Sequence, residues 1–287
     1  MDVITEPFTA SFVSRAAIAG VLVAIGCACA GTWVVLRGMA FLGDAMSHGM
    51  LPGVAIAALV GASLHIGAAI AAILMATGVT ALQRHRRMGN DTTIGLLFVG
   101  MLALGVIIVS ASSSFAVDLT AFLFGDVLSV SSHDVTTLAI TTSVIVLVTL
   151  VGHRAFVLAA FDERIALTTG MRPRLAHAAL LGLLTVAMVS TFSIVGTLLV
   201  FGMLIAPPAA ALLWTSRIFT AMAVAAVLGS ASVLAGLVIS WHAATAAGAT
   251  ISATAVAIFV VSLALSTLQR RPSAPATHHP MERTAET

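Results

Sequence analysis

Long apolar stretches separated by short polar turns follow one another along almost the whole chain. Each stretch has about 20 residues, enough to cross the ~30 Å hydrocarbon core of a bilayer as a helix rising about 1.5 Å per residue. The stretches cover residues 16–36, 40–60, 66–83, 94–112, 135–152, 175–190, 193–214, 218–240 and 246–268. They are continuously apolar rather than alternating, which excludes a transmembrane β-barrel. The pattern predicts an all-α, polytopic membrane helical bundle with about nine transmembrane helices.

Composition agrees with a membrane protein and excludes an ordinary soluble domain. Hydrophobic residues make up 60% of the chain, charged residues make up 8%, and the mean hydropathy is +1.12. A soluble domain carries about 25% charged residues. We expect residues 1–268 to form a single transmembrane domain. The tail 269–287 is rich in Pro, Thr and Ala and has no apolar period, so we expect it to be disordered.

The basic residues are all arginines, and their placement predicts the orientation of the chain. Cytoplasmic loops of membrane proteins are enriched in Lys and Arg. With the N-terminus outside, twelve of the thirteen arginines fall on the cytoplasmic side and only Arg15 falls outside. We therefore expect an external N-terminus and a cytoplasmic C-terminus. The basic pI of about 9.0 reflects these arginines among membrane spans and does not indicate a nucleic-acid partner.

An aspartate and a histidine lie inside the second stretch, where an ionisable residue costs free energy and needs a reason. Asp44 and His48 are spaced i, i+4 and share one helical face, roughly 10 to 17 Å inward from Arg37 at the expected cytoplasmic interface. Carboxylate oxygen and imidazole nitrogen are ligands for Zn²⁺ and also suit Mn²⁺ or Fe²⁺. The pair is predicted to form a transient metal site in an ion pathway. The alternative is that the two side chains only hydrogen-bond each other or a neighbouring helix.

Three prolines and two glycines bear on the shape of the helices. Pro52 removes the hydrogen bond to the His48 carbonyl and should kink the second helix there. Pro207 and Pro208 are expected to break the seventh stretch and to make a gating hinge, although membrane helices also carry proline for packing alone. Gly49 and Gly53 have the GxxxG spacing, which fits close packing of helices in lipid.

The segment 113–134 is external in the expected topology and carries two acidic residues. It is too short and interrupted to span the membrane fully, so a re-entrant or interfacial helix at the outer mouth of a pathway is predicted. Asp118 and Asp126 would then attract cations. The alternative is that these two residues cap or end a short helix.

The chain carries no recognisable ATPase motif. No G-x-x-x-x-G-K-[ST] phosphate loop occurs and the sequence contains no lysine, so ATP-driven transport would require a separate subunit on the cytoplasmic face. The segment at about 160–174 is a predicted dock, because Asp162 suits an N-cap and Gly170 suits a C-terminal stop around Glu163 and Arg164. A short helix lying on the membrane surface fits the same pattern.

Three blocks of the sequence resemble the permease subunits of the zinc/manganese/iron family of ABC importers, and the resemblance extends over residues 12–268. The strongest is Arg37–Ala55, which contains Asp44-x-x-x-His48 and Pro52. The second is Val117–Val130, which is most similar to the zinc branch, and the third is Val195–Ala210. The pair Pro207-Pro208 in the third block departs from the single proline expected there.

The resemblance implies a homodimeric permease of the bacterial plasma membrane with the ion path at the dimer interface. It implies a cytoplasmic ATP-binding subunit, an extracytoplasmic metal-binding protein that delivers the ion, and a coupling helix at residues 162–170. No permanently bound cofactor is expected, and the cargo would be a divalent metal, with Zn²⁺ preferred over Mn²⁺ or Fe²⁺. The alternative function is a stand-alone secondary transporter or channel driven by ion gradients. An intramembrane enzyme is disfavoured, because no paired catalytic carboxylates and no H-E-x-x-H motif occur.

Overall fold

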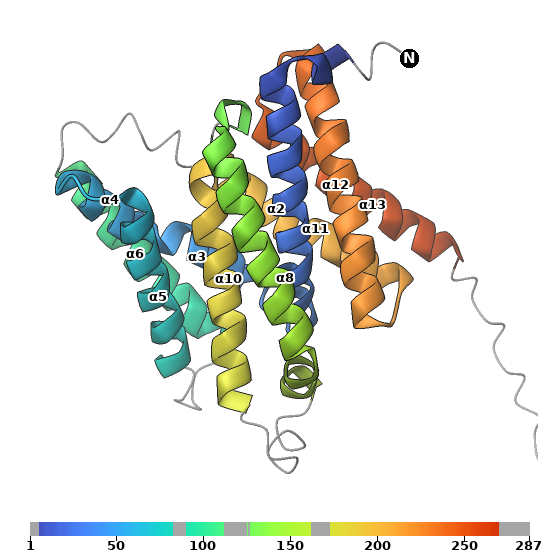
Figure 1. Cartoon of the computed structure of the whole chain (residues 1–287). Helices are drawn as coiled ribbons and strands as arrows, with labels where there is room; N and C mark the ends of the chain where they lie inside the picture. Colours follow the sequence, from blue (N-terminus) through green and yellow to red (C-terminus); the bar gives the residue numbers. More distant parts are fainter. Residues whose placement is uncertain (1–5, 83–89, 112–124, 126, 162–172, 270–287) are drawn as a thin grey trace, which may run out of the picture.

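The computed structural model describes residues 6–82, 90–111, 125, 127–161 and 173–269, and in this part of the chain every regular element is a helix (Figure 1). The elements are η1 (Glu6–Thr9), α2 (Ser11–Leu36), α3 (Ala40–Gly49), α4 (Leu51–Leu59), α5 (Leu64–Leu82), α6 (Asn90–Ser110), η2 (Val127–Ser129), α8 (Ser132–Phe161), α10 (Pro173–Val195), α11 (Thr197–Trp214), α12 (Ile218–Ala243) and α13 (Ala247–Gln269). The all-α prediction is confirmed.

Eight of the described helices are long and apolar enough to cross a membrane, and they correspond to eight of the nine predicted stretches. The remaining stretch, 40–60, consists of the ten-residue α3 and the nine-residue α4, which meet at Met50. Neither is long enough to span alone. Proline explains the interruption, because Pro52 lacks the N–H that would bond the His48 carbonyl and lies in the first turn of α4, where that N–H is not needed.

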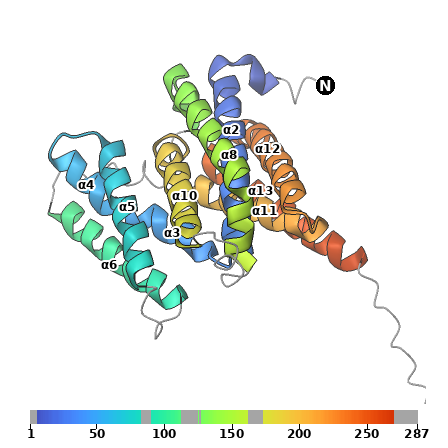
Figure 2. The same ribbon diagram turned by 60° about the horizontal axis from the view of Figure 1, so that its bottom comes forward.

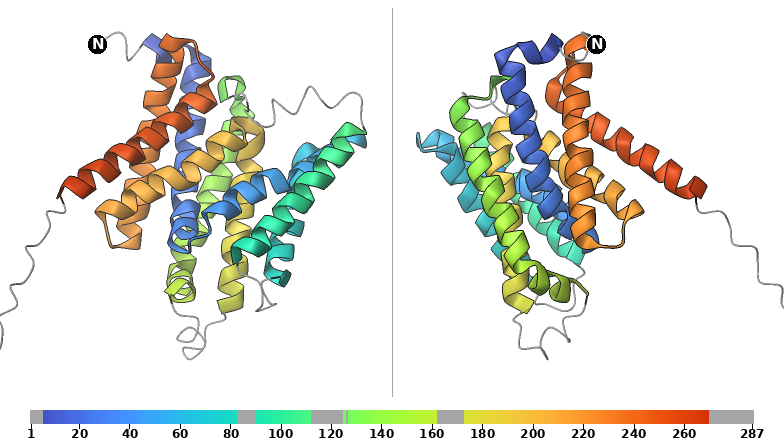
Figure 3. Two further views of the ribbon diagram at one scale, coloured as in Figure 1. Left: turned by 180° about the vertical axis from the view of Figure 1, so that it is seen from behind. Right: turned by 45° about the vertical axis from the view of Figure 1, so that its right-hand side comes forward.

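The helix α2 lies at the centre of one group of helices, and α4, α5 and α6 form a second group beside it. In the first group α2 packs against α8, α10, α11 and α12, and α13 covers α11 and α12. In the second group α5 packs against α4 and α6, and it also contacts α10 of the first group. Figure 2 shows the second group on the left and α12 and α13 on the opposite side. Seen from behind, α3 lies between α2 and α6 and joins the two groups (Figure 3).

The core is built from small and medium apolar side chains, and many large ones lie on the outside. Ala16, Ala19 and Ala24 of α2 are buried in the main core. By contrast, Val151 of α8 is 80% exposed and Leu268 of α13 is 77% exposed. Such exposure would be unfavourable in water over so many residues, but lipid chains cover it without cost, and small residues let helices approach closely. The distribution of side chains is that of an integral membrane protein.

The seventh predicted span differs from expectation at its two prolines. The helix α11 runs without interruption from Thr197 to Trp214 and contains both Pro207 and Pro208, so the expected break is not present. Both prolines are buried. A Cβ on Gly31 of α2 would lie 3.0 Å from Pro208, and one on Gly229 of α12 would lie 3.7 Å from Pro207. The rings therefore pack between α2 and α12, which holds the helix together around the missing N–H groups.

Candidate metal-ion site

The side chains of Asp44 and His48 lie together on one face of α3, as the i, i+4 spacing predicts. The His48 Nε2 atom is 3.4 Å from the Asp44 Oδ1 atom, and the side chains are 28% and 30% exposed respectively. At 3.4 Å the contact is longer than a good hydrogen bond between these groups. In the described part of the chain neither side chain has any other hydrogen-bond partner, so lone pairs of both remain available to an ion.

The opposite face of α3 holds the helix in the bundle. Leu42, Ala45 and Met46 are fully buried in the main core, and Ser47 is buried with its hydroxyl donating to the Gly43 carbonyl at 3.0 Å. A Cβ on Gly43 would lie 2.8 Å from Leu204 of α11, so α3 approaches α11 closely here. The pair Asp44 and His48 therefore projects from the open face of a helix whose other face is fixed.

Two phenylalanines border the pair, and sequence reasoning did not identify them. Phe41 is half-exposed on the same face of α3, one turn before Asp44. The Phe98 ring of α6 contacts both Phe41 (centroids 5.5 Å apart, 70° between planes) and His48 (5.7 Å, 71°), each edge to face. The spacing of Phe41 from Asp44, three residues, would have placed it on this face. No local signal could have found Phe98, because α6 is brought here by tertiary packing.

The site offers two metal ligands from one chain. In the described residues no group of three or more His, Cys, Asp or Glu side chains is arranged to hold a metal ion. The predicted outer-mouth residues Asp118 and Asp126 lie outside the described residues. One carboxylate and one imidazole bind a divalent ion weakly, and further ligands would have to come from water or another chain. Such an arrangement suits passage of an ion rather than permanent storage.

The structure describes the helices on either side of the predicted ATPase dock but not the dock residues themselves. Asp162, Glu163, Arg164 and Gly170 lie outside the described residues. The helix before them, α8, ends at Phe161, and the helix after them, α10, begins at Pro173. Both helices pack against α2. The segment therefore joins two helices that contact the element preceding α3.

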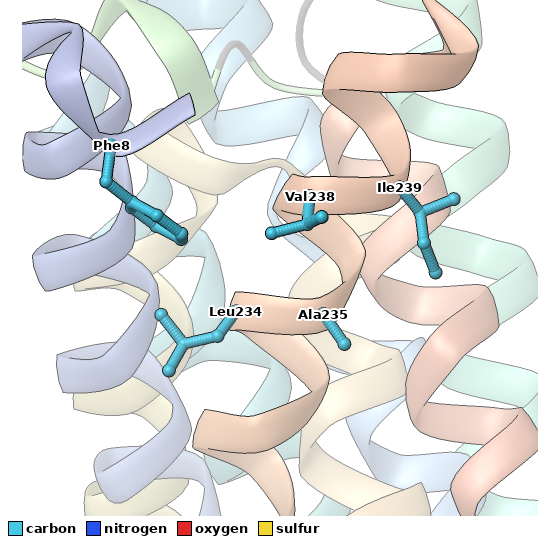
Figure 4. Close-up of a pocket in the computed structure, with 5 residues that line it drawn as sticks. All are labelled: Phe8, Leu234, Ala235, Val238 and Ile239. Carbon is cyan, nitrogen blue, oxygen red and sulfur yellow. The ribbon is translucent and has the colours of Figure 1, made fainter. Parts of the chain in front are cut away.

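An apolar groove lies at a different place from the pair Asp44 and His48. It is an open groove of about 570 Å³ between η1 and α12, lined by Phe8, Leu234, Ala235, Val238 and Ile239 (Figure 4). Its lining side chains are all hydrocarbon. The groove offers no side-chain donor atom to a cation, so the candidate ion site remains the face of α3 that carries Asp44 and His48.

The chain is similar in sequence to membrane proteins of metal-transport systems. Residues 9–266 match the model of the ABC 3 transport family. The manganese transport system membrane protein MntC of Halalkalibacterium halodurans is 37% identical over 260 residues, 90% of this chain and 89% of that protein. A probable iron transport system membrane protein of Haemophilus influenzae is 36% identical over 270 residues, 94% of this chain and 99% of that protein.

A solved structure has the same fold. The structure described as PsaBC from Streptococcus pneumoniae in complex with Fab superposes with a TM-score of 0.80 at 32% sequence identity, over 91% of this chain and 94% of the matched chain.

Proposed function

Because this chain belongs to the ABC 3 transport family, we propose that two copies of it form the pathway through which an ATP-driven importer moves Mn²⁺ or Fe²⁺ into the cell. The chain is a multi-pass protein of the bacterial inner membrane and the permease subunit of an ABC-type importer of divalent metal ions. The homodimer, the identity of the metal and the role of the pair Asp44 and His48 are the proposed parts.

The observation that supports the pathway is the open face of α3. An ionisable pair that projects from a membrane helix must meet water, an ion or another polar group, because lipid alone would leave it unsolvated. Asp44 and His48 are about 30% exposed in the single chain, and among the described residues their only polar contact is with each other. Two copies facing each other across a two-fold axis would bring two carboxylates and two imidazoles together, a four-ligand set for a divalent metal.

The metal is proposed from the relatives and the ligands together. The sequence blocks favoured zinc, whereas the similar proteins are named as manganese or iron transport proteins. Oxygen and imidazole ligands without thiolate suit Mn²⁺ and Fe²⁺, and the two cysteines of α2, Cys27 and Cys29, are not part of the face. We therefore place Mn²⁺ first, Fe²⁺ second and Zn²⁺ third.

Two partners complete the proposal. A cytoplasmic ATP-binding subunit would dock at the segment of about 160–174, through Asp162, Glu163, Arg164 and Gly170, and supply ATP hydrolysis. An extracytoplasmic metal-binding protein would deliver the ion to the outer mouth, where Asp118 and Asp126 would attract it. We do not propose a gating hinge at Pro207 and Pro208, because α11 runs through both buried prolines without a break.

An element panel on metal-starved cells tests the function. Wild type, a deletion, Asp44→Asn, His48→Ala and the control His242→Ala are expressed at equal membrane levels; His242 is exposed at the end of α12, away from the pair. We expect cellular manganese, or iron, to fall selectively in the deletion and in both pair variants, with the control unchanged. A selective fall in zinc would reassign the metal.

Two results would count against the proposal. If no divalent metal changes in the deletion, the chain is not a metal importer. If uptake persists without the ATP-binding subunit and collapses with an uncoupler, the chain is a gradient-driven secondary transporter instead.

A further inference from the structure

A hydrogen bond joins the end of α2 to the beginning of α10. The Arg37 Nη1 atom is 2.7 Å from the His177 Nδ1 atom, and the two residues are 140 positions apart in the chain. A guanidinium has only donors, so Arg37 donates and His177 accepts at Nδ1, which requires a neutral imidazole with its proton on Nε2. The bond is therefore a specific tertiary link rather than a generic contact between surface charges.

Arg37 is connected to the metal-ion site by a short and defined turn. It caps α2, and its backbone N–H donates to the Trp33 carbonyl at 3.1 Å. Gly38 follows with φ of +64°, a left-handed conformation that glycine adopts without strain, and the Met39 N–H donates to the Val34 carbonyl at 3.0 Å. The helix α3 starts at Ala40, immediately after this turn. A displacement of Arg37 would thus be transmitted to the base of the helix that carries Asp44 and His48.

His177 is connected to the proposed ATPase dock in the same way. It lies in the second turn of α10, which begins at Pro173 directly after the segment that includes Gly170. Around the bond, a second hydrophobic cluster separate from the main core holds the helix ends together. It contains Trp33 of α2, Phe156 of α8, Ala176 and Leu180 of α10, and Met222 of α12.

The cluster packs the helix ends on both sides of the proposed dock against α2. The Trp33 and Phe156 rings meet edge to face, 5.6 Å apart at 71°, and both are almost fully buried. Phe156 belongs to the helix that enters the dock segment, and Leu180 belongs to the helix that leaves it. Packed interiors transmit displacement because they have few voids to absorb it.

We propose that Arg37 and His177 are positioning residues that couple the ATPase dock to the ion site. The inference takes the ATPase dock and the ion site from the proposed function. The connection between them rests on the Arg37–His177 bond and the second hydrophobic cluster. When the ATP-binding subunit shifts the start of α10, the Arg37–His177 bond carries the shift to the turn at Gly38, and α3 moves with it. Neither residue touches the ion.

The test uses the complete complex with its ATP-binding subunit in lipid vesicles. Arg37→Met and His177→Leu remove the donor and the acceptor, whereas His177→Asn keeps an acceptor close to the Nδ1 position. Arg154→Met is the matched control, because Arg154 is an exposed arginine on α8 in the turn that contains the buried Phe156. Ion uptake per ATP hydrolysed is measured for each, together with metal binding in the absence of nucleotide.

We expect Arg37→Met and His177→Leu to assemble, hydrolyse ATP and bind metal as wild type does, while uptake per ATP falls about tenfold, as loss of a hydrogen bond to a charged group would cause. His177→Asn and Arg154→Met should stay near wild type. The double variant should be no worse than either single variant, since one bond is lost in all three. Wild-type coupling in either single variant, or additive losses in the double variant, would overturn the proposal.

A second readout separates failure of the link from failure of the metal-import function. Phe41→Cys, at a half-exposed position and in a background of Cys27→Ala and Cys29→Ala, reports the accessibility of the α3 face through its maleimide labelling rate. We expect ATP binding to change this rate in the complex whatever ion is carried, and the change to disappear in Arg37→Met. An unaltered nucleotide response in Arg37→Met would overturn the link even if metal import were confirmed.

Discussion

The Phe98 ring of α6 places its edge against the His48 imidazole of α3, with the ring centroids 5.7 Å apart and the planes at 71°. The same ring contacts Phe41, one turn before Asp44 on the open face of α3. A side chain from a second helix thus restrains one of the two proposed metal ligands. Edge-to-face aromatic pairs contribute about 0.5–1.5 kcal/mol beyond the area they bury. The contact is strong enough to favour one orientation of the His48 ring and too weak to lock it.

Replacing Phe98 should therefore weaken the ion site without abolishing it. We expect Phe98→Leu, which keeps an apolar side chain but loses the aromatic edge, to raise the metal concentration needed for half-maximal uptake by roughly three- to tenfold. Leu96→Ala is the control, because Leu96 lies on α6 and is 58% exposed. The measurement is the initial rate of uptake against metal concentration. Equal curves for Phe98→Leu and wild type would show that the ring has no positioning role.

The glycines of α4 and α5 meet backbone to backbone. A Cβ added to Gly53 would collide with the Gly67 carbonyl oxygen, and a Cβ on Gly67 would collide with the Gly53 carbonyl oxygen. The Gly67 Cβ would also lie 2.7 Å from the Ala57 Cβ. Neither obstacle is the flexible end of a side chain, so the two helices would have to separate.

We expect Gly67→Ala to destabilise the protein by about 1–3 kcal/mol, the usual cost of overfilling a packed contact. Gly100→Ala is the matched control, since a Cβ there meets no atom within 4 Å and alanine favours the helix. The midpoint of thermal aggregation of the purified complex in detergent measures the difference. If Gly67→Ala and Gly100→Ala have equal midpoints, α4 and α5 do not pack as closely at Gly53 and Gly67 as the structure shows.

The fold was predictable from the sequence wherever a local pattern determined it. The apolar stretches match eight spanning helices, and the GxxxG spacing of Gly49 and Gly53 marks the face of α3 and α4 that packs on α5, where Gly49 meets Met75. The course of the chain at its prolines was harder to predict. Pro52 coincides with an interruption, whereas α11 continues through Pro207 and Pro208, because neighbouring helices decide whether a proline ends a helix.

The candidate site shows the same division between local and tertiary information. The shared face of Asp44 and His48 follows from helical geometry, and the structure places the two side chains together. Phe98 and His177 are separated from their partners by 50 and 140 positions and reach them only through the packing of α6 and α10. No spacing rule connects such residues, so a single sequence without its structure does not reveal them.

Glu163 and Gly170 lie in the segment 160–174 that we propose as the ATPase dock. Replacing Glu163 or Gly170 by proline should uncouple ATP hydrolysis from transport, because proline removes a backbone N–H and disrupts the short helix expected there. We expect hydrolysis by the reconstituted complex to persist while metal uptake falls at least about tenfold, in the range typical of lost coupling between sites. Arg217→Gln, at the exposed N-cap of α12, is the control. Normal uptake per ATP in both proline variants would remove the segment from the proposed dock.

The orientation of the chain in the membrane follows from the arginines and is open to direct measurement. A reporter that fluoresces only in the cytoplasm, fused after Thr287, should be fluorescent, because the expected topology places the C-terminus inside with twelve of the thirteen arginines. The same reporter fused after His242, at the end of α12, should be dark, and an alkaline phosphatase that is active only outside should give the opposite result at both sites. Matching signals at the two positions would contradict a crossing by α13. A reversed pattern would place the arginine-rich turns outside, and the dock at 160–174 would then be inaccessible to a cytoplasmic ATPase.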